Sequence, residues 1–232
     1  MKLDKRLTAV CSLVPEVKTV ADVGSDHAYL PVYLLLNSIA QRAIVTDVNA
    51  GPLENGKETC RRFGVYDRCD FRLGSGLSVL KENEAEAITI CGMGGELMKS
   101  ILEKDERVAK SAKYLILQPQ SGFDELNEYL YNNGFGVIDE KIVHEKHLYY
   151  RIIMCSADTP VRKDDFLYPS YLAEKKDATY FDFLKFRLDI CENIIRKIKD
   201  SQKENEDTLS QLDAEKRRIN EVLGIYENQG NY

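Results

Sequence analysis

The segment Thr19-Val20-Ala21-Asp22-Val23-Gly24-Ser25-Asp26-His27-Ala28-Tyr29-Leu30-Pro31 decides the fold class of this chain. An apolar run typical of a β-strand ends in Asp-x-Gly, and a helix-like run follows at once. This pattern is typical of the first strand and first turn of a nucleotide-binding α/β domain. We expect Gly24 to let the backbone approach a ligand closely, and the following helix to direct its free N–H groups toward the same crevice.

The turn in this segment favours a cationic ligand over a dinucleotide. It lacks the G-x-G-x-x-G pattern of pyrophosphate-binding turns and carries two carboxylates, Asp22 and Asp26. S-adenosylmethionine has a sulfonium, an ammonium and a ribose, so it fits this turn better than NAD does. Asp26 has an alternative explanation as the N-cap of the next helix.

The bulk properties are those of a soluble globular protein. The chain has 232 residues, enough for one core and an appendage, with 44% hydrophobic and 30% charged residues. No apolar run approaches the ~20 residues of a membrane span, and the N-terminus lacks a signal-peptide pattern. We therefore expect a cytoplasmic protein without a membrane partner. The net charge of −6 argues only weakly against a nucleic-acid partner, because local basic clusters matter more than the total.

No metal site is expected. The six cysteines include no C-x-x-C pair, and most lie in apolar runs, so buried free thiols are favoured over zinc ligands or disulfides. His144 and His147 are three residues apart on a predicted hairpin, where they face opposite sides, and we interpret them as surface or turn residues.

Strand-like and helix-like runs alternate after a short leading helix in residues 1–13. The expected strands are Thr19–Val23, Ala43–Thr46, Cys69–Leu73, Ala87–Cys91 and Tyr114–Leu117, and the expected helices between them are Leu30–Ile39, Pro52–Phe63, Gly95–Leu102 and Phe123–Asn132. Gly64 and Gly134 mark helix ends. Such alternation predicts a parallel sheet with helices on both faces.

The alternation then breaks at two strand-like runs, Phe135–His144 and Leu148–Cys155, joined by a short link. Strands joined so tightly must be antiparallel. Five parallel strands followed by an antiparallel hairpin are typical of the seven-stranded, Rossmann-like fold of class I S-adenosylmethionine-dependent methyltransferases.

The last part of the chain is polar and predicts two paired helices. Apolar residues recur at steps of three and four in two sets, separated by the polar stretch Ser201–Asp207. The narrow stripes favour an antiparallel coiled-coil pair over a globular core. We place the domain boundary so that residues 1–159 form the Rossmann-like domain and residues 160–232 the helical pair.

Ligands of open parallel sheets bind outside the carboxyl ends of the strands, so four chain segments should surround one crevice. Candidate cofactor-binding residues in them are Asp22, Gly24, Ser25, Asp26, His27, Asp47, Val48, Ser75, Gly76 and Gly92. Asp47 is placed to accept hydrogen bonds from both ribose hydroxyls, or alternatively caps the turn before Pro52. Ser75 is placed to read an adenine edge, or alternatively forms only a tight turn.

The fourth segment is where the substrate is expected to approach. Gly92, Gly94 and Gly95 leave this loop almost without side chains, which suits a flat base close to the methyl donor. Met93 is either part of this site or filler between glycines. Tyr29 is either a stacking partner of the base or a core residue.

The segment from Ala21 to Pro31 resembles the first motif of the bacterial tRNA adenine-22 N1-methyltransferases. The similarity continues in Ala87-Ile88-Thr89-Ile90-Cys91-Gly92-Met93-Gly94-Gly95, in Leu115-Ile116-Leu117-Gln118-Pro119 and in Leu3-Asp4-Lys5-Arg6-Leu7, in the same order as in the family. The chain departs from the family pattern at Ser75, where an acidic residue is common, and carries Gln120 where an Asn also occurs.

This resemblance implies methyl transfer from S-adenosylmethionine to N1 of an adenine in the D-arm region of tRNA. It implies that Asp22, Gly24, Asp26 and Asp47 line the cofactor pocket, and that Asp26 has a direct part in catalysis. The resemblance also implies that Gly92–Gly95, Gln118 and Pro119 border the substrate pocket.

Two other functions remain open at this point. One is a small-molecule methyltransferase of the same fold, and the other is a non-catalytic S-adenosylmethionine-binding RNA adaptor. The absence of Asn/Asp-Pro-Pro-Tyr after the fourth strand argues against N6 chemistry. We expect a monomer or weak homodimer whose contacts to tRNA come from basic clusters, including Arg61 and Arg62 and those of the helical pair.

Overall fold

The computed structural model describes residues 1–162, 167–200 and 206–229. The chain divides into two compact units, Met1–Arg162 and Lys163–Tyr232. The assignment of residues 1–159 and 160–232 to separate functional domains stays a prediction. Among the described residues, no helix combines the length and apolar character needed to cross a membrane.

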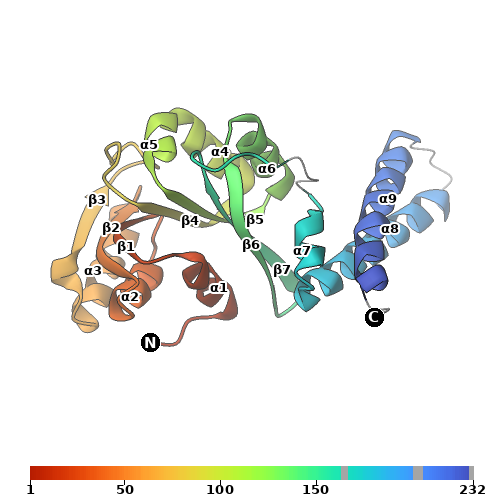
Figure 1. Ribbon diagram of the computed structural model, residues 1–232. Helices are drawn as coiled ribbons and strands as arrows, with labels where there is room; N and C mark the ends of the chain where they lie inside the picture. Colours follow the sequence, from red (N-terminus) through yellow and green to blue (C-terminus); the bar gives the residue numbers. More distant parts are fainter. Residues whose placement is uncertain (163–166, 201–205, 230–232) are drawn as a thin grey trace. The chain divides into compact units, whose positions relative to one another are not determined.

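The first unit is built on one seven-stranded sheet (Figure 1). Its strands are β1 (Val17–Val23), β2 (Ala40–Asp47), β3 (Cys69–Leu73), β4 (Ala87–Gly94), β5 (Tyr114–Ser121), β6 (Gly136–Glu145) and β7 (Leu148–Ser156). Their order is β3-β2-β1-β4-β5-β7-β6. Strands β1 to β5 are parallel, and β7 is antiparallel to both of its neighbours. The predicted methyltransferase-type sheet is confirmed.

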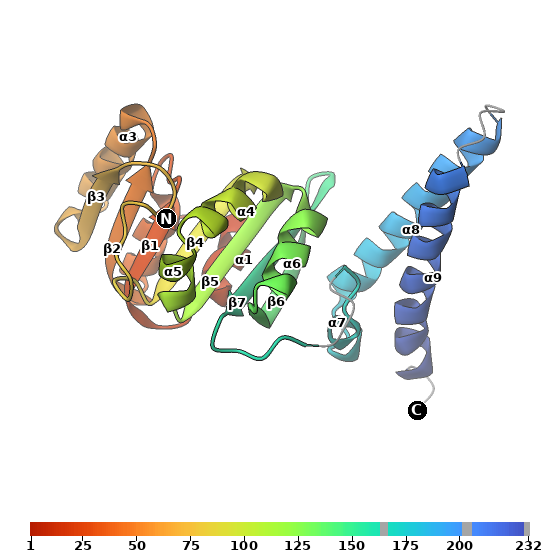
Figure 2. The same cartoon turned by 90° about the horizontal axis from the view of Figure 1, so that it is seen from above.

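Helices cover both faces of this sheet (Figures 1 and 2). One layer contains α1 (Lys5–Leu13), α2 (Tyr29–Leu36) and α3 (Ala50–Arg62), and the other contains α4 (Gly95–Lys104), α5 (Glu106–Ser111) and α6 (Phe123–Asn132). A short 3₁₀ turn, η1 (Tyr66–Arg68), precedes β3.

Alternating strand residues supply the two cores. Val20 and Ile116 belong to the core under α1, α2 and α3, whereas their neighbours Ala21 and Leu117 belong to the core under α4, α5 and α6. Successive side chains of a strand point to opposite faces, so a sheet covered on both sides needs the continuous apolar runs seen in the sequence.

Some element boundaries differ from the expected ones. Helix α2 ends at Leu36 rather than Ile39, because Ser38 has a left-handed φ of 58° that turns the chain into β2. Helix α5 was not predicted, since six residues with Ala109 as their buried member give too short an apolar pattern. Gly64 and Gly134, with φ of 69° and 81°, lie just past helix ends as predicted.

The second unit contains α7 (Ser170–Glu174), α8 (Ala178–Asp200) and α9 (Glu206–Gln229). The ring of Phe181 lies 4.9 Å from that of Tyr226, and Arg187 Nη2 lies 2.5 Å from Glu215 Oε1. Contacts that pair early α8 with late α9 require antiparallel helices, so the predicted helical pair is confirmed. The separating stretch Ser201–Asp207 lies mostly outside the described residues. Helix α7, which packs Leu172 and Ala173 into this unit, was not predicted because it is only five residues long.

Candidate active site

A cavity of about 360 Å³ lies at the carboxyl ends of β1 and β4, where the strand order reverses. Its size is within the range of small-molecule sites, about 300–1,000 Å³. Its walls come from α1, the β1–α2 turn and the ends of β4 and β5. The lining residues are Arg6, Leu7, Asp22, Gly24, Ser25, Asp26, His27, Ala28, Tyr29, Leu30, Cys91, Gly92 and Gln120.

The two carboxylates of the cavity lie in different environments. Asp22, at 6% exposure, accepts a hydrogen bond of 2.7 Å from Thr89 Oγ1. Burial raises the pKa of Asp22, although hydrogen bonds from Ser25 and Thr89 act in the opposite direction. The side chain of Asp26 is 66% exposed, and its Oδ2 lies 3.3 Å from Nε2 of His27. The structure thus gives one buried and one solvated carboxylate to the same turn.

The alternative explanation of Asp26, that it is the N-cap of the following helix, is wrong. The residue before α2 is Ala28, which has a left-handed backbone with φ of 53°, and no side chain caps this helix. The side chain of Asp26 is therefore available to a ligand.

The β1–α2 turn is fixed by its backbone. The N–H groups of Gly24 and Ser25 both donate to the carbonyl of Thr46, at 2.9 and 3.0 Å, which ties the turn to the end of β2. Gly24 has φ of +74°, and a Cβ atom there would lie 2.0 Å from Met93 Cε. The left-handed backbone is what requires glycine here, and the flexible end of Met93 lies over the turn.

Asp47 and Ser75 both take part in turns, as their alternative explanations expected. Asp47 is buried, and its Oδ1 accepts a hydrogen bond of 2.8 Å from the N–H of Asn49. The carbonyl of Ser75 accepts hydrogen bonds from the N–H and hydroxyl of Ser78, at 3.2 and 2.6 Å. Gly76 is left-handed with φ of +58°, and Val48 is 62% exposed. These residues lie at the carboxyl ends of β2 and β3, and their roles toward the cofactor stay predictions.

The glycines after β4 differ in what they contact. Gly92 lines the cavity, and Gly94 precedes α4. A Cβ atom on Gly95 would lie 1.7 Å from the carbonyl oxygen of Gly122. The close approach of the chain before α6 is therefore a sufficient structural reason for glycine at position 95, and its role toward the substrate stays a prediction.

Gln118 is fully buried and is not among the described residues that line the cavity. Arg6 Nη1 donates to Gln118 Oε1 at 2.5 Å, and Gln118 Nε2 donates to the carbonyl of Pro119 at 2.8 Å. Pro119 pairs with Met93 across β4 and β5. These contacts orient the Gln118 amide toward Arg6.

Sequence reasoning did not place Arg6, Leu7, Cys91 or Gln120 in the cavity. The only signal for Arg6 and Leu7 was the motif Leu3-Asp4-Lys5-Arg6-Leu7, which does not show that α1 packs against β5. Cys91 and Gln120 adjoin predicted site residues, and their neighbours were the available signal. Burial, with Asp22 nearby, raises the pKa of the Cys91 thiol.

Within the described part of the chain, no group of three or more His, Cys, Asp or Glu side chains has the arrangement of a metal site. His144 lies on β6 and stacks on Tyr149 with ring centroids 4.4 Å apart. His147 lies in the turn that follows.

Comparisons with known proteins identify the family. Residues 3–153 match the model of the methyltransferase domain family. The chain is 33% identical to the tRNA (adenine(22)-N(1))-methyltransferase of Bacillus subtilis, over 96% of this chain and 98% of that protein. The chain belongs to the tRNA (adenine(22)-N(1))-methyltransferase family.

Solved structures agree with this family assignment. The B. subtilis m1A22 tRNA methyltransferase has a TM-score of 0.82 and 33% identity, over 96% of this chain and 99% of that one. Streptococcus pneumoniae Sp1610, in complex with S-adenosyl-L-methionine, has a TM-score of 0.82 and 28% identity, over 96% and 100%. The resemblance seen in the sequence motifs is confirmed.

Proposed function

We propose that this protein transfers the methyl group of S-adenosylmethionine to N1 of adenine 22 in tRNA, as its relatives in this family are named to do. The observation that carries this proposal is a cavity at the position where the strand order of a methyltransferase-type sheet reverses. In this cavity the buried carboxylate of Asp22 lies beside the glycine turn at Gly24. The match to the B. subtilis enzyme over nearly the full length of both chains supports the choice of substrate.

The residues of the cavity fit the methyl donor. The ionised form of a buried carboxylate with a raised pKa is strongly stabilised by a nearby cation. S-adenosylmethionine supplies two positively charged groups, an ammonium and a sulfonium. Asp22, Gly24, Ser25, His27 and Gly92 would hold the methionine part. Asp47 and Val48 would hold the ribose, with Ser75 and Gly76 at the adenine. The bound donor supplies an electrophilic methyl group.

The residues of the protein mainly have to position the acceptor. Adenine N1 has an in-plane lone pair, so no base is needed to create the nucleophile, and alignment lowers the barrier. Because the product adenine is cationic, the solvated carboxylate of Asp26 at the cavity would hold N6–H and stabilise the developing charge. Tyr29, Met93, Gly94, Gly95, Gln118 and Pro119 would border the base.

We further propose that tRNA modification by this protein takes place in the cytoplasm and that the protein acts as a monomer or weak homodimer.

The target base must leave its stack in the tRNA to reach the cavity, at a cost of a few kcal/mol. The proposal is tested against two alternative functions. They are a small-molecule methyltransferase and an RNA adaptor that binds S-adenosylmethionine without catalysing transfer.

The test is transfer of radioactive methyl from labelled S-adenosylmethionine to unmodified tRNA. We expect label in the wild-type transcript, recovered as 1-methyladenosine at position 22 after digestion, and none in a transcript with guanine at that position. Label in small molecules would instead favour the small-molecule enzyme, and donor binding without any transfer would favour the adaptor.

A further inference from the structure

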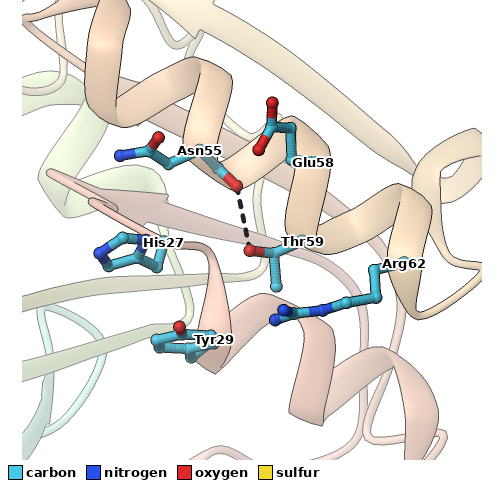
Figure 3. Close-up of a pocket in the computed structure, with 6 residues that line it drawn as sticks. All are labelled: His27, Tyr29, Asn55, Glu58, Thr59 and Arg62. Carbon is cyan, nitrogen blue, oxygen red and sulfur yellow. Dashed lines mark hydrogen bonds between the residues drawn. The ribbon is translucent and has the colours of Figure 1, made fainter.

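A second cavity, of about 450 Å³, lies beside the β1–α2 turn (Figure 3). His27 is the one residue assigned above to the donor that also lines this cavity. His27 and Tyr29 form one side of it, and α3 forms the other. The α3 residues are Asn55, Glu58, Thr59 and Arg62, spaced at three and four so that they share one helix face. We call this cavity the α3 pocket.

The α3 pocket adjoins the candidate active site. His27 and Tyr29 line both cavities. Tyr29, Arg62 and Phe63 also line a third hollow of about 370 Å³, together with residues of the N-terminal segment such as Lys2 and Leu3. Tyr29 is common to all three, so a polymer leaving the active site on this side passes over its ring.

The aromatic side of the α3 pocket suits a nucleobase. The rings of His27 and Tyr29 are stacked, with centroids 5.3 Å apart and an angle of 23° between planes. Tyr29 is 38% exposed although it starts a helix whose next residues are buried. Exposed, pre-stacked rings are the platforms on which proteins hold unpaired bases of RNA.

The helical side of the pocket suits one phosphate. Lys57 and Arg61 on α3 are both paired with Glu54, at 3.0 and 3.4 Å, whereas Arg62 forms no ion pair with any residue the structure describes. The Arg62 guanidinium lies over the Phe63 ring at 5.0 Å, which leaves its N–H groups for an anion. Glu58 in the same wall disfavours a polyphosphate, because a second phosphate would meet a like charge.

We propose that the α3 pocket holds a nucleotide adjoining the target adenosine, with its base on the His27–Tyr29 face and its phosphate at Arg62. This inference rests on the proposed function, since a target base drawn into the active site brings its chain neighbours to the rim. It assigns to α3 a part in substrate recognition that is separate from methyl-donor binding.

The experiment compares Arg62→Gln with Lys57→Gln. The second variant also removes one positive charge from α3, but from a residue that is paired with Glu54. Binding of unmodified tRNA is measured without the donor over a range of salt concentrations. We expect Arg62→Gln to weaken binding by about tenfold, the size of a charge-assisted contact, and to lower the slope of log affinity against log salt by about 0.7–0.9. Lys57→Gln is expected to match the wild type, and donor affinity is expected to be unchanged in both.

Photo-crosslinking provides the second measurement. Transcripts carrying 4-thiouridine next to position 22 are expected to crosslink to the peptide that contains His27 and Tyr29. If the wild type methylates position 22 while Arg62→Gln binds tRNA with wild-type affinity and slope, and no crosslink reaches this peptide, the α3 pocket proposal is wrong and the proposed function stands. If the wild type does not methylate tRNA, the proposed function itself fails.

Discussion

At the scale of single residues, the site is defined by two aspartates that the sequence places four positions apart. Asp22 is buried on β1 and bound by Thr89, whereas Asp26 is solvated in the turn. A buried carboxylate has lost its hydrating water and therefore interacts strongly with a bound cation. An exposed carboxylate can contact a substrate that enters the cavity. We therefore propose that Asp22 binds the cationic donor and that Asp26 contacts the reacting base.

We expect Asp22→Asn to weaken binding of S-adenosylmethionine by roughly 10- to 100-fold, the range of a hydrogen bond to a charged group. The amide still accepts from Thr89, so the fold should be kept. Thr89→Val is the matched control, because it removes the hydrogen bond and keeps the charge. Calorimetric titration measures both, and equal affinity of Asp22→Asn and wild type would contradict the assignment.

The raised pKa of Asp22 gives a pH dependence with a defined sign. In the folded apoprotein the carboxyl keeps its proton to a higher pH than the ordinary aspartate value of about 3.9. The buried negative charge of Asp22 lowers the stability of the folded apoprotein. This loss of stability is relieved when the carboxyl is protonated, as the pH falls through the raised pKa. Donor binding needs the ionised form, so affinity should fall over the same interval and binding should release a proton. Calorimetry in buffers of different ionisation enthalpy measures this release, which Asp22→Asn should abolish.

We expect Asp26→Asn to reduce kcat for methyl transfer by about 100- to 1,000-fold, the usual effect of removing one group that stabilises transition-state charge. The fold should be unchanged, because the side chain is 66% exposed. Single-turnover methylation together with a thermal melt checks both statements. A variant that retains full activity would remove Asp26 from the chemistry.

At the scale of elements, close approaches between loops explain glycines that sequence patterns alone attribute to the ligand. A Cβ atom on Gly24 would meet the flexible end of Met93, and a Cβ atom on Gly95 would meet the backbone carbonyl of Gly122. Both contacts join a parallel strand and the helix after it to a neighbouring loop. At Gly95 the carboxyl edge of the sheet therefore leaves no room for a side chain, whether or not a ligand is bound.

Gly95→Ala tests this packing. The new methyl group would lie 1.7 Å from a backbone oxygen, so the chain must shift, and we expect a loss of about 1–3 kcal/mol in the free energy of unfolding. Gly51→Ala in α3 is the control, because no atom lies within 4 Å of its added Cβ, and it should stabilise by about 0.4–1 kcal/mol. Denaturant unfolding of both variants gives the values, and a neutral Gly95→Ala would contradict the structural explanation.

At the scale of the whole molecule, the two units have different compositions and separate cores. The first buries two apolar clusters against its sheet. The second buries a stripe that includes Tyr180, Leu184 and Cys191 on α8 and Ile219 on α9, and it joins its helices by the Arg187–Glu215 and Glu192–Lys216 ion pairs. Both apolar clusters of the first unit consist of its own residues.

Deletion of residues 160–232 should weaken tRNA binding more than donor binding, since the described residues that line the proposed donor cavity all belong to the first unit. Filter binding of tRNA and calorimetry with the donor measure the two affinities on the same protein. Equal tRNA affinity after deletion would limit the helical pair to a structural or dimerising role.

The sequence alone determined the sheet, its antiparallel end and the helical pair, because these depend on local periodicity and on the length of the connections. It also determined the chemistry of the first turn, since Asp22, Gly24 and Asp26 are adjacent along the chain. Only the tertiary structure decided which of the two aspartates is buried and that Arg6 reaches Gln118, 112 positions away along the chain. The face shared by α3 and Tyr29 likewise depends on packing. Burial and long-range contacts result from how elements pack, and no local pattern of residues encodes them.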